Sequence, residues 1–203
     1  MKKLICLIML LLVIPFTCQA HEIMGYMPNR TKAFTKAIEK YYKDKYGLKL
    51  HTKLEIIVTE KTSQYENILK ILNLYDYLSY DTFAVTEKNT ILINGDHLMD
   101  RHFYSVLAHE MTHKYQEEYW DDLKGDYVML EGLADIIAND ISGYIVDIED
   151  HGIPYEDIKT EKGYKEHMEK DSCKTAEQVR YYAKQSSGFM ARVDKSKIGK
   201  SKK

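Results

Sequence analysis

The pattern of hydrophobic and polar residues predicts a chain that mixes helices with a few short strands. A β-branched run marks a strand at 54–59, and the short segments 83–85 and 90–93 flank a polar turn, which favours a hairpin. Apolar residues at helical intervals predict helices. Their expected ranges are 31–46, 63–78, 103–120, 126–141, 155–170 and 175–193. This order predicts one α+β domain, with a small mixed or antiparallel sheet followed by a central helix and further helices.

The two ends of the chain depart from this pattern. Residues 1–20 have a basic start, an apolar stretch and a small residue, Ala20, at the end, which is typical of a secretory signal peptide. The apolar stretch is short for a bilayer span, so we expect export to the periplasm or the medium without stable membrane insertion. Acylation at Cys18, as in a lipoprotein, and a retained N-terminal anchor are the alternatives. We expect a folded domain over 21–194 and a flexible basic tail over 195–203.

The charge balance narrows the range of partners. The chain has 29 basic and 31 acidic residues, a formal net charge of −2. This near balance gives no basis for nucleic-acid binding over the whole surface. Removal of residues 1–20 leaves Cys173 as the one remaining cysteine, so we expect no intramolecular disulfide. The sequence leaves the oligomeric state open.

The expected helix 103–120 carries the sequence H-E-M-T-H from His109 to His113. With 3.6 residues per turn, the two histidines lie about one turn apart on the same stripe, and Glu110 falls within the same sector. Two imidazoles on one face can hold one metal ion, with a carboxylate beside it to move protons. The same five-residue sequence would also occur in a polar patch on a surface helix, or where two histidines are satisfied by hydrogen bonds.

A catalytic zinc takes three protein ligands and one water, so a third ligand must come from further along the chain. In the metzincin pattern a Gly and a His follow the second His, but Gln116 and Tyr119 occupy those positions. The next expected helix offers Glu131 among apolar residues, where an unpaired carboxylate would be costly to bury. Asp135 lies four residues on, on the same face, where it can orient a ligand imidazole.

At these residues the chain resembles the gluzincins, the thermolysin-like branch of zinc metallopeptidases. The resemblance covers residues 103–141 and implies Zn²⁺ held by His109, His113 and Glu131. It also implies Glu110 as the general base and Asp135 as support for the first histidine. The separation of His113 and Glu131 is slightly shorter than is usual in that family, which predicts a tight connection over 119–125. The expected reaction is hydrolysis of a peptide or protein substrate.

The resemblance also implies a zincin-like domain, in which an edge strand lines the cleft. On that basis the strand 90–93 is expected to bind an extended peptide by strand addition, and the alternative is an ordinary sheet strand. A further donor for the oxyanion is usual in related enzymes. Spacing does not choose among the candidates Tyr127, Tyr144, Tyr155, Tyr164, His151 and His167.

Two other functions fit the same sequence. A non-catalytic exported zinc-binding or adhesion domain would keep the metal for stability, and a protease with one dedicated protein target would be inactive on general substrates. A structural zinc is normally closed by four protein ligands and has no use for a proton acceptor. Glu110 therefore favours catalysis.

Overall fold

The computed structural model describes residues 21–74, 83–96, 98–120 and 123–186 of the 203-residue chain. The expected signal peptide and the basic tail lie outside the described residues. The strands are β1 (Glu22–Gly25), β2 (Glu55–Thr59), β3 (Ala84–Glu87) and β4 (Thr90–Asn94). The helices are α2 (Pro28–Tyr46), α3 (Thr62–Ile71), α4 (Asp100–Tyr119), α5 (Tyr127–Ser142), α6 (Tyr155–Ile158), α7 (Glu161–Lys170) and α8 (Ser172–Gln185).

The strands form one mixed sheet in the order β1-β2-β4-β3. β1 and β4 each run parallel to β2, and the hairpin partner β3 runs antiparallel to β4. Successive side chains of a strand point to opposite faces. Ile91 and Ile93 of β4 accordingly join the core beneath α2 and α4, whereas Leu92 packs with Tyr65 and Leu69 of α3 on the other face. Both faces are covered, which explains why β2 and β4 read as continuous β-branched runs.

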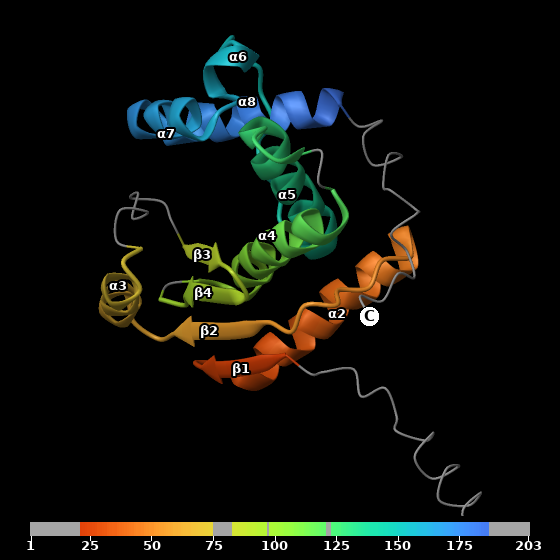
Figure 1. Cartoon of the computed structure of the whole chain (residues 1–203), viewed down its shortest axis with the longest axis vertical. Helices are drawn as coiled ribbons and strands as arrows, with labels where there is room; N and C mark the ends of the chain where they lie inside the picture. The colour runs from red at the N-terminus through yellow and green to blue at the C-terminus, as the bar shows by residue number, and fades with distance from the viewer. Residues whose placement is uncertain (1–20, 75–82, 97, 121–122, 187–203) are drawn as a thin grey trace, which may run out of the picture.

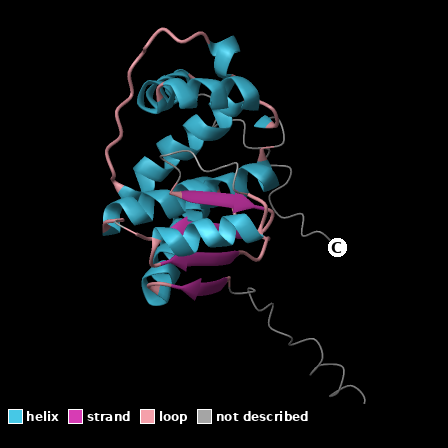
Figure 2. Cartoon of the chain, turned by 90° about the vertical axis from the view of Figure 1, so that its left-hand side faces the viewer, coloured by secondary structure: helices cyan, strands magenta, loops and turns pink. Residues whose placement is uncertain are grey.

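The remaining helices form a second part of the same structure. α4 lies between the sheet and α5, and α5 leads to α6, α7 and α8 at the end of the molecule away from the sheet (Figure 1). The side view shows the same arrangement, with the strands at one end and this group of helices at the other (Figure 2). The long segment after α5 is anchored on α8, where Arg180 Nε donates to Asp147 O over 2.8 Å.

α5 and α8 approach each other closely at Gly132. A Cβ placed on Gly132 would lie 2.6 Å from Val179 O and 2.6 Å from the Cβ of Ala183. Glycine therefore allows a helix-to-helix contact that a larger residue would prevent. This contact holds α8 close to the part of α5 that follows Gly132.

The predicted α+β class and the 83–93 hairpin are confirmed. The helix expected over 155–170 is divided, because the Thr160 side chain accepts a hydrogen bond from Gly163 N and begins a new helix there. Asp171 caps α8 in the same way, so α8 begins at Ser172, three residues before the expected start. The helix expected over 63–78 is too long, because α3 ends at Ile71 and residues 72–74 are not helical. The rest of that range, and residues 187–193 of the helix expected over 175–193, lie outside the described residues.

Two expectations about the sheet were wrong or incomplete. The strand 90–93 was expected at an edge, but β4 is paired on both sides and β3 is the edge strand of the described sheet. β1 was not predicted, because four residues with a mostly exposed pattern carry little periodic signal. No helix within the described ranges is long and apolar enough to cross a bilayer.

Candidate metal centre and proton acceptor

α4 presents the two histidines of the H-E-M-T-H sequence on one side. Its opposite side buries Phe103, Leu107 and Met111 in the main core, which fixes the rotation of the helix. The imidazole rings of His109 and His113 lie edge to face, with centroids 4.7 Å apart. Their Nε2 atoms are 3.0 Å apart, so both nitrogens face one point.

α5 brings Glu131 to the same point. Glu131 Oε2 lies 3.3 Å from His109 Nε2 and 3.7 Å from His113 Nε2. Ligand atoms about 2.0–2.1 Å from a tetrahedral zinc ion lie about 3.3–3.4 Å from one another. The separations of 3.0, 3.3 and 3.7 Å bracket this value, and the donor set of two imidazoles and one carboxylate is one that zinc binds. The residues present therefore fit a single zinc ion.

Asp135 and Arg180 lie behind the first histidine. Asp135 Oδ1 is 2.7 Å from His109 Nδ1, and its other oxygen accepts a hydrogen bond from Arg180 Nη1 over 3.1 Å. With Nδ1 donating to the carboxylate, the Nε2 atom of His109 is the one directed at the metal position. The structure places Asp135 where the sequence predicted it, and adds Arg180 from α8, which the sequence did not indicate.

The charges of the centre are strongly coupled. Burial lowers the pKa of His109, but the hydrogen bonds and negative charges of Asp135 and Glu131 outweigh it and hold this pKa well above its ordinary value. Burial raises the pKa of Glu131, yet the neighbouring imidazoles leave it below its usual range. The pKa of Asp135 is likewise lowered, against burial, by His109 and Arg180. The ionised carboxylates of Glu131 and Asp135 thus favour a positive charge at the centre.

Glu110 follows His109 in α4, and its side chain is directed at strand β3 of the sheet. Its side chain is buried, and one carboxylate oxygen accepts a hydrogen bond from the Thr86 hydroxyl of β3. A carboxylate held in place beside a metal position can accept and return a proton. Thr86 was not among the predicted residues, and its contact depends on the pairing of β3, which the sequence does not specify.

The structure separates the six candidates for an oxyanion donor. Tyr155 donates to Asp126, Tyr144 stacks on His102, His151 bonds to Glu177, and His167 bonds to Gly163 O. Tyr164 is close enough to the centre that its pKa, raised mainly by burial, is raised further by Glu131 and Asp135. Its ring contacts that of Tyr127, with centroids 5.8 Å apart. The pKa of Tyr164 is thus affected by both carboxylates of the centre.

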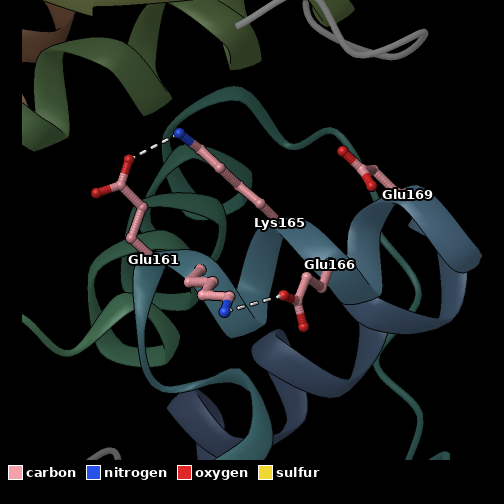
Figure 3. Close-up of a pocket in the computed structure, with 5 residues that line it drawn as sticks. Glu161, Lys165, Glu166 and Glu169 are labelled. Atoms are coloured by element: carbon pink, nitrogen blue, oxygen red, sulfur yellow. Dashed lines mark hydrogen bonds and ion pairs between the residues drawn. The ribbon is translucent and has the colours of Figure 1, made fainter. Parts of the chain in front are cut away.

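Two other polar features of the described residues do not belong to this centre. Glu149, His151 and Glu177 form a second group whose ligand atoms lie within 4.8 Å of one another, but His151 Nε2 is already bonded directly to Glu177. A hollow on α7 is lined entirely by charged side chains of that helix, two pairs of which form ion pairs (Figure 3). Neither feature contributes a side chain to the metal centre.

A search of family models, of curated proteins and of solved structures gave no match to this chain.

Proposed function

We propose that the protein is an exported zinc-dependent endopeptidase of the gluzincin type. The observation that supports this most strongly is the convergence of His109 Nε2, His113 Nε2 and Glu131 Oε2 at separations of 3.0–3.7 Å, with Glu110 next to His109 in α4. A zinc ion with three protein ligands keeps a fourth position for water and lowers the pKa of that water towards neutrality.

The role that we assign to Glu110 is proton transfer. Thr86 holds one of its carboxylate oxygens, so the other is the atom expected to take a proton from the attacking water and return it to the leaving nitrogen. Burial of the side chain keeps bulk water from competing for this proton. Tyr164 is the residue we would assign to stabilise the negative charge that develops on the carbonyl oxygen.

The edge strand β3 is the surface that we propose for the peptide. Asn94 N donates to Phe83 O over 2.8 Å. In an antiparallel ladder, alternate residues direct their backbone groups towards and away from the partner, so Ala84 and Thr86 direct theirs to the side of β3 that has no partner strand among the described residues. An extended peptide added there would lie beside Thr86, whose side chain contacts Glu110. This proposal replaces the strand 90–93, which has no open edge.

The decisive experiment compares the full exported chain with its Glu110→Gln variant on a mixed peptide library. We expect cleavage to fall by about 10²–10⁴-fold, the usual contribution of a general base, while the zinc content remains that of the wild type. The matched control is Glu166→Gln on the exposed face of α7, which should cleave normally. Undiminished cleavage by Glu110→Gln would refute the assigned role.

The rival function, a non-catalytic zinc-binding or adhesion domain, gives a different result in the same assay. Both the wild type and the variant would bind zinc and neither would cleave the library. A protease with one dedicated target would also leave the library intact, but it would cleave a protein in an extracellular extract only when Glu110 is present. The three-residue ligand group found among the described residues favours an open, catalytic site over a closed, structural one.

A further inference from the structure

Gln116 connects the second histidine to the helix that carries the third ligand. Its side chain is buried, with 3% of the residue exposed. Gln116 Oε1 lies 2.8 Å from His113 Nδ1, and Gln116 Nε2 donates to Leu130 O over 2.9 Å. Leu130 directly precedes Glu131 in α5, so one amide touches a ligand imidazole on one side and the backbone next to the third ligand on the other.

The orientation of this amide is determined by its neighbours. A backbone carbonyl can only accept a hydrogen bond, so the NH₂ group of Gln116 must face Leu130 O. The amide oxygen then faces His113, and because it too can only accept, Nδ1 of His113 must carry the proton. In the neutral imidazole the remaining nitrogen, Nε2, then carries the lone pair, and it is the atom 3.7 Å from Glu131 Oε2.

We propose that Gln116 is a positioning residue that sets both the tautomer of His113 and the spacing of α4 and α5 at the metal. This inference rests on the proposed zinc site and extends it. Asp135 holds the first histidine through an anion, whereas Gln116 holds the second through a neutral amide. The neutral amide adds no further negative charge to a centre that already holds the carboxylates of Glu131 and Asp135.

The test uses the full chain and two readouts, neither of which is catalysis. Zinc affinity is measured by competition with a chromogenic chelator. The tautomer of His113 in metal-free protein is measured from long-range ¹H–¹⁵N correlations of its ring. Gln116→Met keeps the length of the side chain but removes both hydrogen bonds. We expect about 10–100-fold weaker zinc binding and loss of the pure Nδ1–H tautomer.

Two further variants separate positioning from general stability. Gln178 is also fully buried, and its amide oxygen accepts from His151 N and Ile153 N, away from the centre. Gln178→Met should destabilise the fold and leave zinc affinity within about twofold of the wild type, because the groups that orient the ligands are untouched. Gln116→Glu keeps an acceptor for His113, so it should retain the Nδ1–H tautomer and bind zinc more tightly than Gln116→Met.

The outcomes are distinct. If the wild-type protein binds no zinc, the proposed function itself is refuted. Wild-type protein that binds zinc while His113 is in the Nε2–H form when metal-free would overturn the role of Gln116 alone, even if Gln116→Met fails to fold. Equal loss of zinc affinity in Gln116→Met and Gln178→Met would also overturn it, because the effect would then be one of stability.

Discussion

Replacing Gly132 with alanine should test the contact between α5 and α8 on which the support of the metal centre depends. The new Cβ would lie 2.6 Å from Val179 O, a backbone atom, and 2.6 Å from the Cβ of Ala183. Overpacking of this kind costs about 1–3 kcal/mol, and alanine recovers about 1 kcal/mol of helix propensity relative to glycine. Because one of the two close atoms belongs to the backbone of α8, the upper part of the steric range applies.

The expected net loss is therefore about 1–2 kcal/mol of unfolding free energy, which lowers Tm by about 2–8 °C in a chain of this length. Chemical denaturation followed by circular dichroism measures it. Ala183→Gly removes one of the two contacts, so a double-mutant cycle with Gly132→Ala should show favourable coupling between the two changes. A Gly132→Ala protein as stable as the wild type, or more stable, would show that the helices do not approach as described.

The other predictions concern the ligands and their support. Glu131→Ala should reduce bound zinc to well below the one equivalent expected of a three-residue site, as measured by elemental analysis, whereas Glu177→Ala in the second group should leave the zinc content unchanged. Arg180→Met removes the cation behind Asp135, and we expect zinc affinity to fall about tenfold in chelator competition. The exposed residue Lys184 on the same helix supplies the control, Lys184→Met, and equal losses in both would contradict the role of Arg180.

The centre was largely predictable because its chemistry is local in sequence. Helical periodicity is enough to place His109 and His113 on one stripe, and it also places Asp135 one turn from Glu131. A carboxylate among the apolar residues of a helix indicates by itself that a partner must lie nearby. Gln116 could have been found in the same way, since a residue three positions after His113 on a helix lies within reach of its ring.

The parts that were not predictable depend on packing between distant segments. The position of β3 at the edge follows from the parallel pairing of β2 with β4. The sequence of neither strand identifies its partner. Arg180 reaches Asp135 only because Gly132 lets α8 approach α5. This approach cannot be predicted from the sequence of either helix alone. The contact of Thr86 with Glu110 requires both the hairpin register and the rotation of α4.

The two halves of the structure supply different parts of the proposed chemistry, and α4 is common to both. α5 and α8 supply the third ligand, Glu131, and the support behind the first histidine. The sheet supplies the hydrogen bond to Glu110 and, among the described strands, the edge strand β3. If this division holds, changes in α8 should act first on metal affinity, whereas changes along β3 should act on substrate binding with the metal in place. α4 can serve both halves because its core-facing side is fixed against the sheet, which leaves the side bearing His109 and His113 to face α5.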